Sequence, residues 1–299
     1  MTKQFKADLA LLIVTIGWGS SFLLSKNALS DLDTYNFLAV RFLMAFIVSA
    51  VIFHKKLLTI DKKTFKLGLA MGGILYLHYA LQTVGLNITT VSKSAFITGT
   101  NVVMVPIFSA LLIKRLPQKQ AVLGVVFAFV GMALLTLNSG NIGLNFGDIL
   151  TFLCAVVFAL YIILVGKYTV EVESVAFAVI QIGVVGFLSL GTSLVMETPH
   201  LPTTVASWSN IGFLAVACTS IAFIVQNVGQ QYTSPTHTAL IYSGEPVFAA
   251  IFAYIVAGEV LGPKGMTGAL LILCGMLVAE IDFGKVFKKG RKVQYDQAR

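Results

Sequence analysis

Ten apolar stretches of about 20 residues follow one another along the chain, which is the length that a helix needs to cross a bilayer. The last five stretches retrace the first five at a nearly constant offset. Because five is odd, the two copies have to lie in the membrane in opposite orientations, as in many secondary transporters. We therefore expect an all-α integral membrane protein of ten transmembrane helices, arranged as two inverted-topology five-helix repeats. The expected spans are 7–26, 35–53, 67–86, 93–113, 119–137, 146–166, 174–196, 210–231, 236–257 and 264–282.

Composition excludes a water-soluble fold. Hydrophobic residues make up 57% of the chain and charged residues 11%, whereas soluble domains carry about 25% charged residues. The ten spans and the short loops between them use almost all of the 299 residues. Little of the chain is left for a soluble module.

The distribution of Lys and Arg predicts the orientation in the membrane, because these residues are concentrated in cytoplasmic loops. With the N-terminus inside, 17 of the 21 Lys and Arg residues fall on the cytoplasmic side and three fall outside; the last, Arg41, lies within a span. We expect a multi-pass protein of the cell membrane with both termini cytoplasmic. The positive charge, including the basic tail at 288–292, then serves topology and contact with anionic lipid, and no nucleic acid partner is expected.

Internal repetition is visible in the residues themselves. A shift of 144 superimposes 68–132 on 212–276 without a gap, and a shift of 140 aligns the preceding spans. The matches that carry weight are Gly and Gln residues, because two apolar sequences share Leu and Val by chance; they include Gln82 with Gln226, Gly85 with Gly229, Gly124 with Gly268 and Gly131 with Gly275. The first repeat is predicted over 1–140, and the second, with the basic tail, over 141–299.

Several short motifs in a fixed order give the chain a family resemblance. They are Gly17-Trp18-Gly19-Ser20-Ser21-Phe22, Arg41, Gly147-Asp148, Glu245-Pro246-Val247-Phe248 and Gly258-Glu259. In this order the chain resembles the drug/metabolite transporter superfamily, specifically its ten-helix EamA-type members. The resemblance implies two inverted five-helix repeats around a central cavity and the movement of small metabolites, often the export of amino acids. Arg115 departs from the pattern, since relatives often carry an acid there as well as at the position of Glu259.

Polar residues that share one helix face at mid-depth are the signal for a solute path through the membrane. Four spans carry such a stripe, and an aromatic residue lies midway along the first span. The candidate substrate-binding residues are Trp18, Tyr79, Gln82, Thr98, Asn101, Gln226, Tyr242 and Glu245. The alternatives are hydrogen bonds between helices, at about 0.6 kcal/mol each, for the two glutamines, and core packing for Trp18.

Glu245 is the residue that most needs an explanation, because an acid at the bilayer centre costs roughly 2.5–3.5 kcal/mol. One hypothesis is that Glu245 binds a cationic group of the substrate or exchanges a proton that couples transport. The other is that Pro246 interrupts the helix and Glu245 caps the freed amides. The two roles are compatible.

Further residues are predicted to act in gating or structure. Arg41 is interpreted as an anchor that snorkels outward or pairs with Asp33, with contact to a substrate carboxylate as the alternative. Pro106 and the pair Gly244 and Pro246 predict kinks in repeat-related spans.

The predicted function is secondary transport of small metabolites by alternating access, with export of amino acids or related compounds as the expected activity. No Gly-rich phosphate loop with Lys-Ser/Thr occurs in the sequence. The alternatives are a flippase-like carrier of amphipathic lipids or lipid-linked sugars and, less favoured, an integral-membrane transferase. We expect no cofactor and no metal, membrane lipid and a small-molecule substrate as partners, and a monomer or homodimer.

Overall fold

The structure, a computed structural model, describes residues 2–114, 118–136, 145–257 and 262–280, and all regular secondary structure in these ranges is helical. The elements are α1 (Lys3–Ala28), α2 (Thr34–Ile52), α3 (His54–Leu58), α4 (Lys62–Ile88), α5 (Val91–Gly99), α6 (Asn101–Ile113), α7 (Lys119–Thr136), α8 (Phe146–Tyr168), α9 (Ser174–Met196), α10 (Val205–Ala215), the π-helical turn η1 (Val216–Ile221), α11 (Ala222–Gly229), α12 (Pro235–Tyr242), α13 (Glu245–Ala257) and α14 (Pro263–Glu280). Arg115, the predicted repeat boundary at 140, Gly258-Glu259 and the tail at 288–292 lie outside the described residues.

Each expected span coincides with one helix or with consecutive helical segments. Seven of these are long and apolar enough to cross a membrane, and 119–135 and 263–279 form shorter apolar helices. Two helices begin about five residues earlier than the apolar pattern predicts, because polar caps extend them: the Asp61 side chain accepts from the Thr64 amide, and the Thr204 side chain accepts from the Ser207 amide. The basic loop at 54–66 also contains the short helix α3, which was not predicted.

Two spans are broken at positions that differ by the offset of the predicted repeats. The first breaks at Thr100 between α5 and α6, and the second between Tyr242 and Glu245, so that α6 and α13 begin 144 residues apart. Pro106, the predicted kink residue, lies inside α6, and the break in this span lies upstream of it. A proline ring clashes with the carbonyl one turn before it, which puts the disturbance on its N-terminal side.

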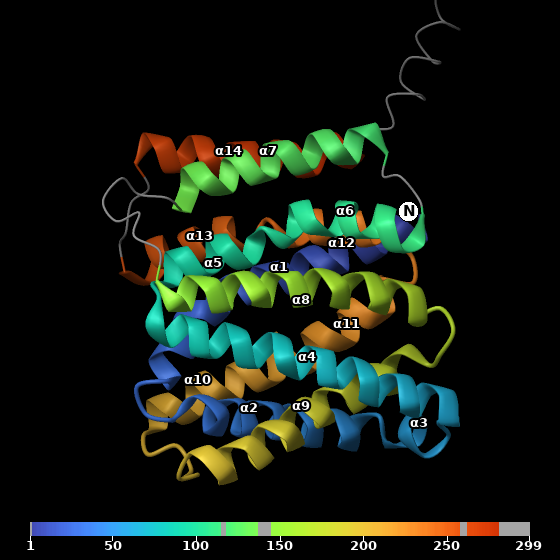
Figure 1. Cartoon of the computed structure of the whole chain (residues 1–299), viewed down its shortest axis with the longest axis vertical. Helices are drawn as coiled ribbons and strands as arrows, with labels where there is room; N and C mark the ends of the chain where they lie inside the picture. The colour runs from blue at the N-terminus through green and yellow to red at the C-terminus, as the bar shows by residue number, and fades with distance from the viewer. Residues whose placement is uncertain (1, 115–117, 137–144, 258–261, 281–299) are drawn as a thin grey trace, which may run out of the picture.

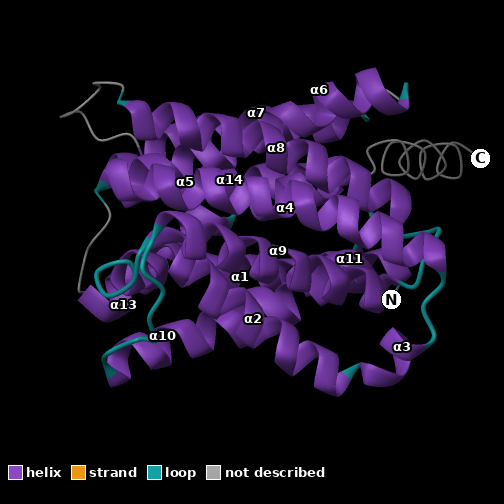
Figure 2. Ribbon diagram, turned by 60° about the horizontal axis from the view of Figure 1, so that its bottom comes forward, coloured by secondary structure: helices purple, strands orange, loops and turns teal. Residues whose placement is uncertain are grey.

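The helices form a bundle in which α1 lies near the centre and contacts α10, α11, α12 and α13. The pair α7 and α14 packs at one end of the long axis, and α2, α9 and α10 lie at the other (Figure 1). The N-terminus and α3 lie at the same edge of the bundle (Figure 2).

The contact between α7 and α14 depends on glycine. A Cβ atom on Gly124 would lie 2.6 Å from the carbonyl oxygen of Gly275, and a Cβ on Gly131 would lie 2.6 Å from that of Gly268. A shift of 144 residues, the offset of the predicted repeats, exchanges these two contacts. Backbones this close leave no room for a side chain, as at small-residue crossings of membrane helices.

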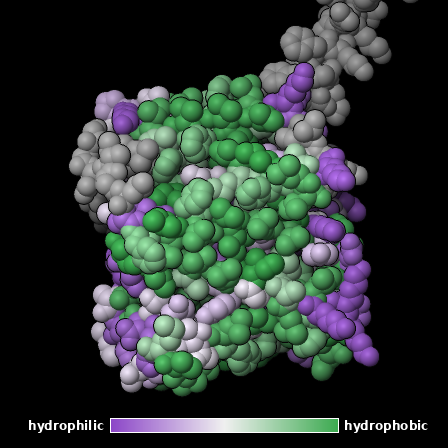
Figure 3. Space-filling model, in the orientation of Figure 1, coloured by the Kyte–Doolittle hydropathy of each residue, from purple (hydrophilic) through white to green (hydrophobic). Residues whose placement is uncertain are grey.

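The surface is apolar where a soluble protein would be polar. An apolar band covers the middle of the face in Figure 3, and hydrophilic residues gather along its two side edges. Large side chains such as Ile13, Leu111 and Val195 are 63%, 70% and 85% exposed. The interior in turn holds fully buried polar side chains, among them Gln181, Thr219 and Asn227. This distribution suits a protein solvated by lipid around its girth.

Candidate functional site

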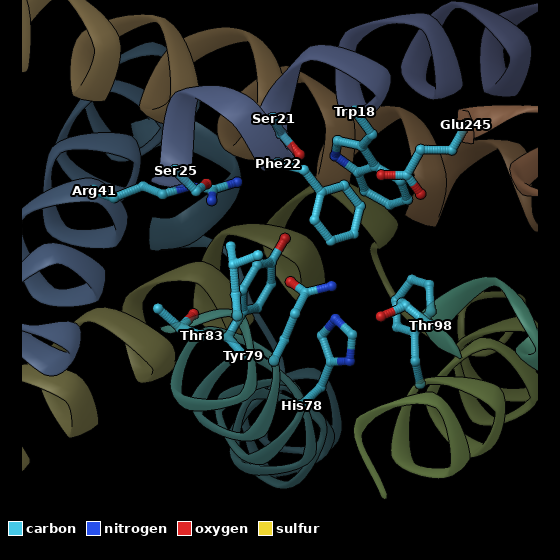
Figure 4. A pocket seen from close by; sticks show the side chains of 13 residues that line it. Trp18, Ser21, Phe22, Ser25, Arg41, His78, Tyr79, Thr83, Thr98 and Glu245 are labelled. Carbon is cyan, nitrogen blue, oxygen red and sulfur yellow. The ribbon is translucent and has the colours of Figure 1, made fainter. Parts of the chain in front are cut away.

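A narrow cavity lies between α1, α2, α4, α5, α8 and α13 (Figure 4). The space open to the centre of a water molecule is about 30 Å³. Five of the eight predicted substrate-binding residues line it, together with Arg41. The full lining is Trp18, Ser21, Phe22, Ser25, Arg41, His78, Tyr79, Gln82, Thr83, Leu86, Thr98, Phe158 and Glu245.

Trp18 forms part of an aromatic wall. Its Nε1 donates to the carbonyl oxygen of Cys218 at 2.9 Å, and its ring centroid lies 4.9 Å from that of Tyr242 and 5.7 Å from that of Phe223. A ring that is fixed by a hydrogen bond and by tilted neighbours presents a rigid apolar face. His78 extends this wall, stacked on Phe158 with ring centroids 4.4 Å apart.

Arg41 is buried, at 3% exposure, and points toward the cavity. Its Nε donates to the Thr219 hydroxyl at 2.9 Å, and its guanidinium carbon lies 5.3 Å from the centroid of the Tyr79 ring. The expected ion pair with Asp33 is not formed, because Arg41 turns inward to Thr219 and Asp33 precedes α2 as its N-cap. The terminal nitrogens of Arg41 make no hydrogen bond with another residue in the described ranges.

Glu245 is the first residue of α13, and its carboxylate points toward the cavity (Figure 4). No side chain within the described part of the chain forms a hydrogen bond or an ion pair with it. The ion pairs present there are Lys56 with Glu173, Lys63 with Glu171 and Lys93 with Asp148. An acid that faces a cavity in this way is available to a ligand or a proton.

Three predicted substrate-binding residues do not line the cavity. Asn101 donates through Nδ2 to the Thr98 carbonyl at 2.8 Å, across the break before α6. Gln226 is fully buried and donates to Gln230 Oε1 at 3.2 Å. Tyr242 packs behind Trp18, and its buried hydroxyl has no hydrogen-bond partner in the described structure.

Some lining residues were missed by the sequence reasoning. Ser21, Phe22 and Ser25 stand at i+3, i+4 and i+7 from Trp18, so helical spacing predicts that they share its face of α1. Thr83 follows Gln82 directly, and Phe158 lies within a continuous apolar run. Nothing in that run marks which face of α8 is turned to the cavity.

The EamA-like transporter family matches the sequence over residues 5–137 and again over 145–280. The chain belongs to the EamA-like transporter family. It is therefore a multi-pass membrane protein of the drug/metabolite transporter superfamily, and a transporter of that kind.

Relatives of this EamA-like transporter are also described as transporters. A protein of Archaeoglobus fulgidus, described as an uncharacterized transporter, is 36% identical over 93% of this chain and 87% of its own length. YyaM of Bacillus subtilis, also described as an uncharacterized transporter, is 28% identical over 67% and 68%. A solved crystal structure with a TM-score of 0.77 covers 92% of this chain and 96% of its own, at 17% identity, and this likeness bears on the fold alone.

The EamA-like transporter also has a second hollow, a groove of about 480 Å³. The groove lies between α2, α9, α10 and the segment that joins α9 to α10. It is lined by Asn36, Ala39, Val40, Leu43, Met44, Ile47, Val48, Leu190, Pro199, His200, Leu201 and Trp208. The groove and the central cavity have no lining residue in common.

Proposed function

We propose that this protein is a secondary transporter that exports small metabolites, with amino acids and related compounds as the substrate class. It works by alternating access at the cavity between α1, α2, α4, α5, α8 and α13. The observation that carries this proposal is the pairing of an apolar wall with Glu245 and Arg41, whose charges no described residue neutralises. Buried polar groups that are left unsatisfied point to a ligand or to water.

The helix breaks support the same proposal. In transporters with inverted repeats, substrate sites are formed by discontinuous helices at the repeat interface. Here α5/α6 and α12/α13 are interrupted at positions 144 residues apart, and Thr98 and Glu245 beside the interruptions line the cavity. We propose that the repeats, 1–140 and 141–299, move against each other there, with Gly244 and Pro246 beside the second break.

The orientation is part of the proposal. The distribution of Lys and Arg supports a protein of the cell membrane with both termini in the cytoplasm. In agreement with this, α3 with its basic residues lies at the same edge as the N-terminus. The lining residues of α1 run from Trp18 toward its C-terminal end. The cavity therefore extends from mid-depth toward the external side. Cysteine placed at position 3 or 288 should be labelled only from inside; labelling of one of them from outside would reject this orientation.

A solute carrier is favoured over a lipid flippase. A flippase needs a lateral path from the binding site into lipid. The groove beside α2 shares no lining residue with the central cavity, so it does not supply such a path. The lining of the cavity also mixes charged with aromatic groups, which suits a polar solute.

The test is flux through the purified full-length protein in sealed proteoliposomes, with pools of amino acids and related metabolites. We expect saturable efflux that responds to an imposed pH gradient, and we expect Glu245→Gln to remove that response. Thr267→Val serves as a matched control, because Thr267 is exposed and bonds its own helix. If Glu245→Gln moved substrate with an unchanged pH response, proton exchange at Glu245 would be rejected; absence of flux for every pool would reject the transporter proposal.

A further inference from the structure

We infer that the central cavity is built for a solute that carries a cationic group and an anionic group at separate ends, with Glu245 binding the cation and Arg41 the anion. This inference rests on the proposed function, and it names the substrate class of that site. It covers ω-amino acids and basic amino acids, which present an ammonium at the end of a chain that leads to a carboxylate.

The anion end is defined by Arg41. A guanidinium at 3% exposure would normally have a carboxylate partner, since an unpaired buried charge is costly. Within the described ranges Arg41 has a hydroxyl on Nε and the faces of Phe42 and Tyr79 at 5.4 and 5.3 Å, but no acid. The Thr219 bond fixes one side of the guanidinium, and the terminal N–H groups remain for a planar anion. This is the geometry in which Arg binds a carboxylate through two parallel bonds.

The cation end is defined by Glu245 and the ring of Trp18. The carboxylate has no basic partner in the described structure, and Trp18 lines the same cavity. An ammonium group is bound favourably both by a carboxylate and by the face of an indole. Both contacts are stronger between the apolar walls of a narrow cavity than in bulk water.

The two ends do not meet. Arg41 and Glu245 form no ion pair with each other, and they lie at opposite ends of the labelled side chains, with Phe22 and Tyr79 between them (Figure 4). A ligand that reaches both needs a chain between its charges, and that chain lies along an apolar middle. A neutral α-amino acid carries its two charged groups on the same carbon atom and reaches only one end.

A matched set of five-carbon probes tests this. The set is 5-aminopentanoate with its charged groups at opposite ends, norvaline with both on one carbon, pentylamine with the cation alone and pentanoate with the anion alone. Binding to the purified full-length protein is measured by calorimetry, and counterflow is measured in proteoliposomes. We expect 5-aminopentanoate to bind at least tenfold more tightly than the other three. Equal binding of norvaline, or of either single-charge probe, would overturn the inference.

Two variants assign the ends. Glu245→Gln should reduce the affinity for 5-aminopentanoate at least tenfold and leave the affinity for pentanoate unchanged. Arg41→Gln should also reduce the affinity for 5-aminopentanoate at least tenfold, but it should leave the affinity for pentylamine unchanged. An unaltered affinity for 5-aminopentanoate in both variants would contradict the assignment. If Arg41→Gln fails to fold, the four probes on the unmodified protein still decide. If solutes that lack one of the charges were transported and bound as tightly as 5-aminopentanoate, this inference would be rejected and the transporter proposal would stand. Absence of all flux would reject the transporter proposal instead.

Discussion

The Trp18 indole donates to the carbonyl oxygen of Cys218, the residue that directly precedes the Thr219 hydroxyl to which Arg41 donates. Both acceptors belong to the π-helical turn η1, in which the Thr219 hydroxyl also donates to the Leu214 carbonyl five residues back. An inserted residue of this kind rotates the helix locally and is frequent at functional sites. The turn η1, in the second half of the chain, thus binds Trp18 and Arg41, two cavity residues from the first half.

Replacing Trp18 should separate its two contributions. Trp18→Phe keeps an aromatic wall but loses the bond to Cys218, and we expect a loss of about 1 kcal/mol in stability with substrate preference retained. Trp18→Ala opens the wall and should change the relative flux of substrates at least several-fold. Thermal melting and competition flux check this. A Trp18→Ala protein with lower expression but unchanged preference would show that the ring only packs the core.

The two repeat-related glutamines should respond differently to truncation. Gln82 lines the cavity, whereas Gln226 is fully buried and bonds Gln230, which in turn donates to the Ile162 carbonyl at 3.0 Å. We expect Gln82→Ala to weaken substrate binding without lowering the melting temperature. Gln226→Ala should lower the melting temperature and leave the binding constant of the folded protein unchanged. Calorimetry and melting curves on both variants test this, and the reverse pattern would contradict it.

The α7/α14 crossing should not tolerate a methyl group. In Gly131→Ala the new Cβ would meet the Gly268 carbonyl at 2.6 Å and the Ile272 amide at 2.8 Å, and such overpacking costs about 1–3 kcal/mol. Gly73→Ala is the matched control, because nothing lies within 4 Å of its Cβ position. We expect a lower midpoint of denaturation only for Gly131→Ala. Equal midpoints for the two variants would show that the helices separate at no cost.

Asp31 should make stability depend on pH. Hydrogen bonds from the Ser207 hydroxyl and from the Thr203 hydroxyl and amide hold the pKa of this carboxyl below its ordinary value. A lowered folded-state pKa stabilises the protein above the ordinary pKa, and this contribution is lost as the pH falls through the lowered pKa. Asp31→Asn should therefore melt earlier than the unmodified protein at pH 7, and the difference should close in acid.

The control for Asp31 is its neighbour. Asp33→Asn should leave the melting temperature unchanged at each pH, because the Asp33 side chain makes no capping hydrogen bond to α2. If the difference in melting temperature between Asp31→Asn and the unmodified protein stayed constant across the pH range, the role of the ionised carboxylate would be contradicted.

The spans were predictable because apolar length alone decides what crosses a bilayer. The π turn and the contacts inside the bundle have no comparable signal in the sequence. The π turn at Thr219 leaves no mark in the sequence, and the contact between Thr219 and Arg41 joins residues 178 positions apart. The same helical spacing predicted that both Gln82 and Gln226 would bind substrate, yet only Gln82 lines the cavity. Helices that match in sequence need not turn the same face inward.

The break before Glu245 and the break before Asn101 lie 144 residues apart, but of these two residues only the acid lines the cavity. If the halves exchange conformations, the opposite state exposes an amide in place of a carboxylate. The two states then differ in free energy even when the protein is empty. The empty carrier is then open to one side of the membrane more often than to the other, while the solute gradient still sets the direction of net movement.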